Sequence, residues 1–164
     1  MNHILHSHIL GAECKTRGST FNISGIESDP QDVILCRTHI LGPLRMSSTR
    51  IAEPSGASGP VVYSTAGDLG RLLSALCTPA PGGASPLLNE ASIDRLLAVG
   101  ERFGLEKRID RGTATAGLEL THSSRDSTAL LRWYPQDGRG VVVVTRGGDG
   151  IPAARRIAGL VLGQ

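Results

Sequence analysis

Residues 118–145, LELTHSSRDSTALLRWYPQDGRGVVVVT, contain the pattern that decides the fold. Three segments within them are rich in apolar and β-branched residues, which favour a pleated and buried surface. These segments are Leu118–Ser123, Thr128–Tyr134 and Val141–Thr145. The sequence therefore predicts three consecutive extended segments in this part of the chain.

Asp137 and Gly138 mark the turn between the last two of these segments. Aspartate followed by glycine favours a hairpin, because glycine adopts a positive φ without strain and aspartate tolerates one. Pro135 and Gly140 flank the pair, so a loop of roughly four or five residues is favoured over the two-residue type.

The valine run at Val141–Val144 lacks the alternation of polar and apolar residues that a half-exposed strand shows. We therefore expect both of its faces to be covered, one of them by a helix over Pro152–Leu162. On that helix, we expect the two arginines to lie on the solvent side and the larger aliphatic residues to face the sheet. The arginines are Arg155 and Arg156, and the aliphatic residues are Ile157, Leu160 and Val161.

Length and composition indicate one domain with an aliphatic core. The chain has 164 residues, of which 40% are hydrophobic and 3% aromatic. A net charge of +2 with scattered arginines argues against nucleic acid as a partner. No apolar run reaches the roughly 18 residues of a membrane-spanning helix. Residues 1–11 lack the basic start and apolar core of a signal peptide, so a cytoplasmic location is the default expectation.

Metal and disulfide chemistry find little support in the sequence. Three cysteines, an odd number without CxxC spacing, predict buried or incidental thiols. His3, His6 and His8 together with Cys14 are the nearest approach to a ligand set, but no carboxylate or further histidine follows at ligand spacing. We therefore expect no metal, no cofactor and an irregular segment over residues 1–27.

The order of the expected elements predicts an α+β fold within one domain over residues 28–164. Three helices precede the sheet, a loop rich in Ser, Gly and Pro separates the first two, and a turn separates two further strands. The helices start near Ser28, Thr65 and Asn89, and the first and third end at Gly42 and Gly100. The loop is Ser47–Gly59. The two further strands, Phe103–Ile109 and Thr113–Leu120, flank the turn Asp110–Gly112. At the second helix, Thr65 is expected to cap the first turn and Asp68 to favour its positive end.

Several stretches, in this order, resemble the serine β-lactamase and penicillin-binding-protein superfamily, in particular its class C β-lactamase-like and esterase-like branch. ILGPLRM at residues 40–46 resembles the family segment IFEPLGM, and VYSTAGDLGRLLSAL at 62–76 resembles GLVSTAxDLARFLxAL. LLNEASIDRLL at 87–97 resembles LLSPESVxxM, and THSS with the following hairpin resembles GHSGG…LLAYDPDRGLGVVVLTNG. The resemblance runs from about Ser28 to the end of the chain and covers only the latter half of the family's domain. It implies an incomplete β-lactamase/transpeptidase-like fold.

The resemblance also implies catalytic motifs that this sequence lacks. Family members use a serine nucleophile in an S-x-x-K motif and a supporting Tyr-x-Asn loop. The two lysines, Lys15 and Lys107, have Ala12 and Gly104 three residues before them, and Tyr-x-Asn does not occur. No catalytic residue is therefore assigned.

A third family motif, K/H-[ST]-G on a strand at the edge of the site, is similar to His122–Ser123–Ser124. The resemblance implies a substrate-binding role for these three residues, although Ser124 stands where the family has glycine, which puts a Cβ where backbone approaches substrate. His122 and Ser123 cannot form a nucleophile–base pair with each other, because neighbouring residues on a strand point to opposite faces.

Two functions follow as hypotheses. The first is a truncated serine hydrolase that is inactive alone, whose intact parent would transfer an acyl group from a β-lactam-like or related small molecule. The second is a non-catalytic interaction module. In the family, strands from the start of the domain pair beside the C-terminal hairpin. Without such strands, the Val141–Val144 edge would be a template for self-association or for a partner chain.

Overall fold

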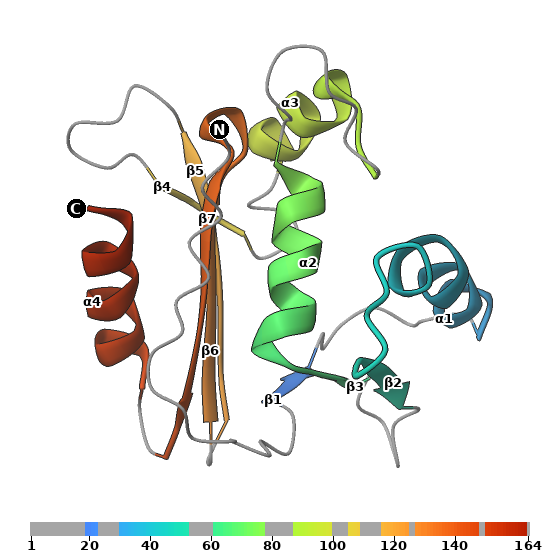
Figure 1. The fold of residues 1–164 in the computed structure, drawn as a ribbon, viewed down its shortest axis with the longest axis horizontal. Helices are drawn as coiled ribbons and strands as arrows, with labels where there is room; N and C mark the ends of the chain where they lie inside the picture. Colours follow the sequence, from blue (N-terminus) through green and yellow to red (C-terminus); the bar gives the residue numbers. More distant parts are fainter. Residues whose placement is uncertain are drawn as a thin grey trace.

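The computed structural model describes residues 19–22, 30–52, 61–77, 87–99, 105–108, 116–124, 127–147 and 150–163. In chain order, the elements are β1 (Ser19–Asn22), α1 (Pro30–Cys36) with a π-helical continuation (Arg37–Leu41), β2 (Arg50–Ala52), β3 (Val61–Ser64), α2 (Ala66–Leu76), α3 (Glu90–Val99), β4 (Glu106–Arg108), β5 (Gly117–Ser123), β6 (Ser127–Tyr134), a 3-10 turn (Pro135–Asp137), β7 (Arg139–Arg146) and α4 (Ile151–Leu162). Figure 1 shows their arrangement.

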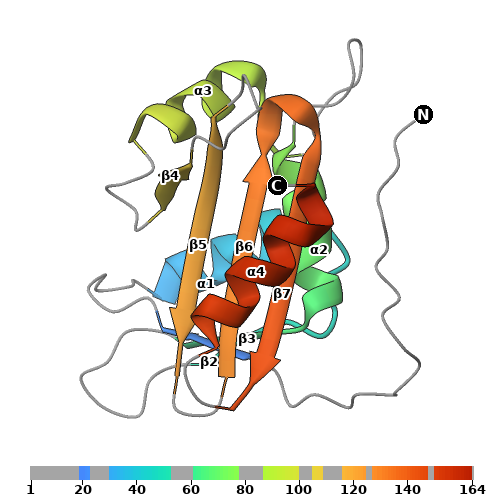
Figure 2. The same ribbon diagram turned by 90° about the vertical axis from the view of Figure 1, so that its left-hand side faces the viewer.

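The centre of the fold is a four-stranded antiparallel sheet in the order β4-β5-β6-β7. Helix α4 packs on one face of this sheet and α2 packs on the other, so that three layers are seen when the sheet is viewed edge-on (Figure 1). Figure 2 shows α4 crossing its face obliquely, in front of β6 and β7. The predicted α+β class is therefore confirmed.

Strand β6 is buried on both faces because each face supports its own core. Ala129, Leu131 and Trp133 form one cluster with Leu69 and Leu73 of α2. On the other face, the cluster contains Leu130 of β6, Val143 of β7, and Ala154 and Ala158 of α4. The expected extended segments and the cover over the valine run are confirmed, with β5 formed by one continuous strand.

The β6–β7 connection has the length that the sequence predicts. Pro135–Asp137 form a short 3-10 turn, and Gly138 follows in the left-handed region with φ 63°. Pro135 supplies a fixed φ at the start of this turn, and glycine at its end carries no Cβ that would oppose a positive φ. The strands then pair without a bulge from Tyr134 opposite Arg139 to Ser127 opposite Arg146.

A second, three-stranded sheet in the order β1-β3-β2 was not expected from the sequence. Strand β2 lies within the stretch 47–59 that is expected to be a loop, and β1 lies within the segment 1–27 that is expected to be irregular. These strands span three or four residues each, which is too short for an alternating pattern to be seen. Both pair with β3, which enters α2 directly.

The orientation expected for α4 is wrong for Arg155, Ile157 and Leu160, whereas Arg156 is exposed as expected. Ala154 and Ala158 face the sheet and are fully buried, whereas Leu160 is 74% exposed and Ile157 37% exposed. Arg155 is turned toward the sheet and bonds buried Glu119, as described below. The sheet already places Leu130 and Val143 in this layer, and the helix packs against them through its alanines.

The starts of the other predicted helices agree with the sequence. Thr65 Oγ1 accepts a hydrogen bond from Asp68 N, and Asn89 Oδ1 accepts one from Ser92 N at 2.8 Å. The apolar residues of α1 do not form a buried stripe, since Ile34 is 61% and Leu35 is 52% exposed. The expectations for His3, His6, His8, Cys14 and Lys15 lie outside the described residues, as does the turn at 110–112.

Two cysteines fall within the described residues, and both are free thiols that are partly buried. Burial raises the pKa of Cys36 and raises that of Cys77 to about 11. Both thiols are therefore protonated at neutral pH, which makes them poor nucleophiles. In the described part of the chain, none of the helices combines the length and the apolar character needed to cross a membrane.

Replacing Gly117 by alanine is expected to destabilise the sheet. A Cβ at this position would lie 2.6 Å from Cε1 of Tyr134, whose side chain is fully buried. Overpacking of this kind costs about 1–3 kcal/mol, which urea denaturation would measure. Gly70→Ala is the matched control, since nothing lies within 4 Å of its added Cβ in helix α2 and stability should rise or stay constant. Equal stability of Gly117→Ala and the parent chain would contradict the packing described here.

Candidate functional site

The three residues that resemble the K/H-[ST]-G motif lie at the end of β5. The register pairs His122 with Ala129 and Ser123 with Thr128. Ala129 belongs to the core beneath α2, so His122 lies on the α2 face of the sheet. Ser123 lies on the α4 face, where its Oγ is 3.0 Å from Thr128 Oγ1. His122 and Ser123 therefore lie on opposite faces of β5.

Ser124 closes the hairpin between β5 and β6. Its backbone N donates to the carbonyl of Ser127 at 2.8 Å, and its Oγ accepts a hydrogen bond from Ser127 N at 3.2 Å. The same hydroxyl lies 3.1 Å from Ser127 Oγ. The Ser124 side chain, which departs from the glycine of the motif that this segment resembles, thus bonds to Ser127 across the base of the hairpin.

The electrostatic state of His122 follows from its partly buried position. Burial lowers the pKa of His122 below its ordinary value, because the imidazolium form loses hydration. The neutral imidazole is therefore favoured at neutral pH. A neutral ring can exchange hydrogen bonds with an acyl compound, but it supplies no positive charge to a carboxylate.

The described basic and nucleophilic groups do not form an S-x-x-K-like arrangement. Lys107 lies on β4 opposite Leu118 and is exposed. The hydroxyl of Ser64, which is 1% exposed, lies 2.7 Å from Thr49 Oγ1. Within the described ranges, no group of three or more His, Cys, Asp or Glu residues could hold a metal ion.

A polar network surrounds the start of α2, in the stretch that carries the most specific resemblance. Asp68 is 2% exposed, and its Oδ2 accepts hydrogen bonds from Ser48 N at 2.9 Å and from Thr49 Oγ1 at 2.8 Å. Its Oδ1 accepts one from Arg71 at 2.6 Å. One carboxylate therefore joins the segment before β2 to the first turn of α2, in addition to the cap that Thr65 forms.

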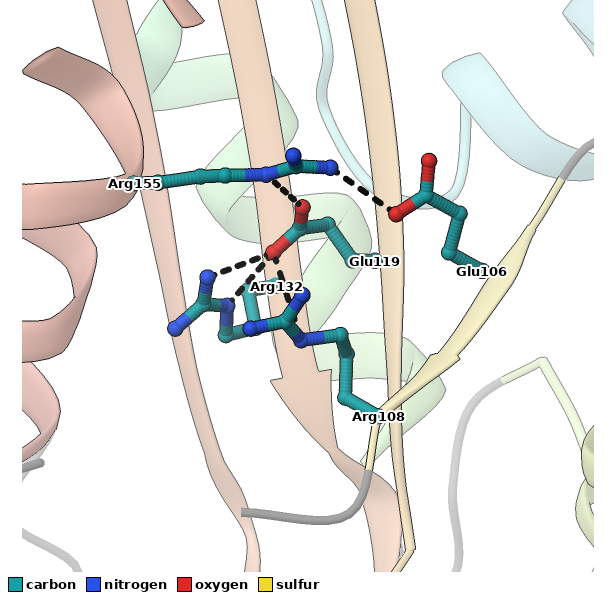
Figure 3. Close-up of polar contacts among 5 residues, drawn as sticks. All are labelled: Glu106, Arg108, Glu119, Arg132 and Arg155. Atoms are coloured by element: carbon teal, nitrogen blue, oxygen red, sulfur yellow. Dashed lines mark hydrogen bonds and ion pairs between the residues drawn. The ribbon is translucent and has the colours of Figure 1, made fainter. Parts of the chain in front are cut away.

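A second polar network, which the sequence did not predict, lies on the α4 face of the main sheet (Figure 3). Glu119 of β5 is fully buried and is bonded by Arg132 of β6, with Nη2 to Oε2 at 2.6 Å and Nε to the same oxygen at 2.7 Å. Arg155 of α4 donates from Nε to Glu119 Oε1 at 2.7 Å and from Nη2 to Glu106 Oε2 at 2.9 Å. Arg108 Nε of β4 approaches Glu119 Oε2 at 3.9 Å.

This Glu119 network holds its central carboxylate in the charged form. Burial alone would raise the pKa of Glu119, but hydrogen bonds from Arg155 and Arg132 outweigh it, and the pKa lies below its ordinary value. The nearby charge of Arg108 acts in the same direction. A carboxylate with a lowered pKa is a poor general acid or base near neutral pH. The role of this network is structural, because its ion pairs join α4 and β4 to the central strands β5 and β6.

The sequence contained one signal that could have predicted the Glu119–Arg132 pair at the centre of this network. Glu119 and Arg132 are direct cross-strand partners in the β5–β6 hairpin. Opposite charges at equal distance from a hairpin turn predict such a pair once the register is known. The register depends on the Ser124–Ser127 closure, which the sequence pattern did not specify. Arg155 could not be assigned, because its partner lies 36 residues away.

Asp68→Ala is expected to destabilise the protein by about 1–3 kcal/mol, because buried donors around its carboxylate lose their acceptor. Arg71→Ala is the matched control, since its side chain is 54% exposed and an exposed ion pair contributes less than about 1 kcal/mol. Chemical denaturation monitored by circular dichroism would compare the two. Similar losses for both variants would show that the Asp68 network is not the source of stability.

Glu119→Leu is expected to cost about 3–5 kcal/mol, because it leaves buried guanidinium charge without its carboxylate. Glu119→Leu/Arg132→Leu should recover most of this loss, and Glu106→Gln should cost less than about 1 kcal/mol, since Glu106 is 54% exposed. Denaturant unfolding of the three variants measures these differences. No recovery in the double variant would contradict a buried-charge origin.

The same network predicts an acid limit of stability. Because the pKa of Glu119 is lowered in the folded state, its contribution is complete above the unfolded value of about 4.3. The contribution is lost as pH falls through the folded pKa. Unfolding measured from pH 7 downward should therefore show a shallower acid decline in Glu119→Gln than in the parent chain. Identical declines would contradict this assignment.

Comparisons with models of protein families, with curated proteins and with solved structures find no match to this chain.

Proposed function

We propose that residues 28–164 form the C-terminal part of a β-lactamase-related serine hydrolase domain. We also propose that this chain alone does not catalyse acyl transfer. The observation that carries the proposal is the ordered set of family-like segments between residues 40 and 148. The STAGD segment begins α2, and the THSS segment ends β5. An antiparallel hairpin and a C-terminal helix on the sheet follow in the expected order.

The absence of S-x-x-K from the sequence supports the proposal that this chain alone is catalytically inactive. A serine hydroxyl needs an adjacent base to attack an acyl carbon at useful rates. In this chain the hydroxyls of Ser64, Ser123 and Ser124 bond to other hydroxyls or to hairpin backbone. These hydrogen bonds stabilise strand junctions.

In the intact parent, we propose that the His122–Ser123–Ser124 strand contacts the acyl compound. His122 is the residue of the three that lies on the α2 face. Its lowered pKa favours hydrogen bonding by a neutral ring. The use of Ser124 in the hairpin turn limits how closely the strand backbone can approach a substrate.

The chain is expected to remain unmodified by acylating reagents. After incubation with a fluorophosphonate or a labelled penicillin, its intact mass should stay at 17.2 kDa. It should also show no turnover of a chromogenic cephalosporin or a p-nitrophenyl ester, because no serine has a lysine at the right offset. An active S-x-x-K hydrolase labelled in parallel is the positive control. One stoichiometric adduct on a single serine would refute the proposal, and peptide mapping would identify that serine.

A second candidate function is a non-catalytic interaction module. The observation that favours it is the position of β7 at the edge of the main sheet, where the strand pairs with β6 and with no other described strand. An edge strand of this kind offers its backbone to another chain. The valine run makes this edge apolar.

A further inference from the structure

The two edges of the main sheet differ in how they are protected. Strand β4 forms one edge with only three residues, Glu106, Lys107 and Arg108. A short, charged edge resists pairing with another chain. Among the described strands, β7 forms the other edge with eight residues and carries four consecutive valines without proline or an internal charge. Only the β7 edge therefore has the properties of a strand-pairing surface.

The exposure of the valines indicates where β7 is open. Helices α2 and α4 both contact β7, one on each face. Val141, Val142 and Val144 are nevertheless only partly buried. With helices on both faces, this partial exposure is what an outer edge left uncovered by the described residues would produce.

Helix α4 extends this apolar surface on its own face. Arg155 points toward β5 and β4, where it bonds Glu119 and Glu106. Ile157 follows two residues later, about 200° around the helix at 3.6 residues per turn. Ile157 therefore lies on the flank of α4 toward the β7 edge, where it is 37% exposed.

A second copy of the chain fits this edge poorly. Two β7 strands paired across a two-fold axis would lie about 4.8 Å apart. Helix α2 contacts β7 more extensively than β6, and Figure 2 shows it beside β7 at the sheet edge. The symmetry-related copy of α2 would then crowd α2 on the same face of the joined sheet, where packed helix axes need about 8–10 Å between them. A single added strand brings no such helix.

The charges at the ends of β7 indicate what the added strand carries. Arg139 already bonds Asp137 at 3.0 Å. Arg146, at the other end, is exposed and has no carboxylate partner among the described residues. A carboxylate on the incoming strand opposite Arg146 would form a charge-assisted pair.

We propose that β7 binds a single extended peptide segment of another polypeptide, antiparallel to β7. This segment is β-branched or apolar at successive positions and acidic at the N-terminal end that meets Arg146. The inference deepens the second proposed function, the interaction module, and does not depend on acyl chemistry. Main-chain hydrogen bonds to β7 would supply affinity, and the valines, Ile157 and Arg146 would supply selectivity.

The test uses the full chain and a fluorescein-labelled octapeptide of valine and threonine whose first residue is aspartate. Fluorescence anisotropy should show saturable binding, which Arg146→Glu weakens about tenfold or more. An octapeptide that begins with lysine should restore binding to Arg146→Glu. The matched control peptide is N-methylated at alternate residues, which removes main-chain donors, and it should not bind. Lys107→Glu is the control variant on the opposite edge, where this side chain is exposed, and it should leave peptide binding unchanged.

Each alternative occupant has its own readout. Sedimentation should show a monomer of 17.2 kDa with and without peptide. A dimer of twice that mass, dissociated by the peptide, would assign the edge to a second copy and overturn the proposal. Strong protection of the Val141–Thr145 amides from hydrogen exchange in a peptide-free monomer would show that the chain's own residues cover the β7 edge. That result would also overturn the proposal. Equal binding of the N-methylated peptide, or no saturation, would also overturn it. An acylated serine would refute the inactive-hydrolase proposal and leave these results unaffected.

Discussion

The fully buried carboxylate of Glu119 is the constraint on which the main sheet and its C-terminal helix depend. A buried charge is tolerated only where opposite charges and hydrogen bonds replace its hydration. Arg132 and Arg155 provide both, from the next strand and from α4. A slip of one residue between β5 and β6 would turn Glu119 toward the aliphatic core beneath α2. The ion pair therefore specifies the register as well as the position of the helix.

Asp68 has the corresponding role on the other side of the molecule. Apolar contacts between α2 and the sheet are not directional, so they do not determine where the helix begins. The Asp68 carboxylate does so, because it accepts hydrogen bonds from residues 19 and 20 positions earlier in the chain. Two buried carboxylates, one on each side of the sheet, thus orient the two helices that cover it.

The sequence predicted elements with strong local signals and missed those that depend on tertiary contact. The hairpin at Asp137-Gly138 and the caps at Thr65 and Asn89 are encoded within a few residues, and the structure confirms them. The prediction of which face of α4 is buried was wrong. Periodicity places the large aliphatic residues inward, but the helix packs on the sheet through alanines. The sequence placed the His122–Ser124 segment on its strand. The cross-strand partners of this segment and the Glu119 network could not be predicted without the three-dimensional structure.

The single tryptophan of the chain gives this arrangement a spectroscopic consequence. Trp133 is 3% exposed and lies in the core between β6 and α2. Its Nε1 has no hydrogen-bond partner in the described part of the chain, so its indole ring is in an apolar environment. Intrinsic emission should therefore be blue-shifted in the native state. The emission reports the docking of α2, because α2 contributes the helical residues of the Trp133 cluster, whereas α4 packs on the opposite face of β6.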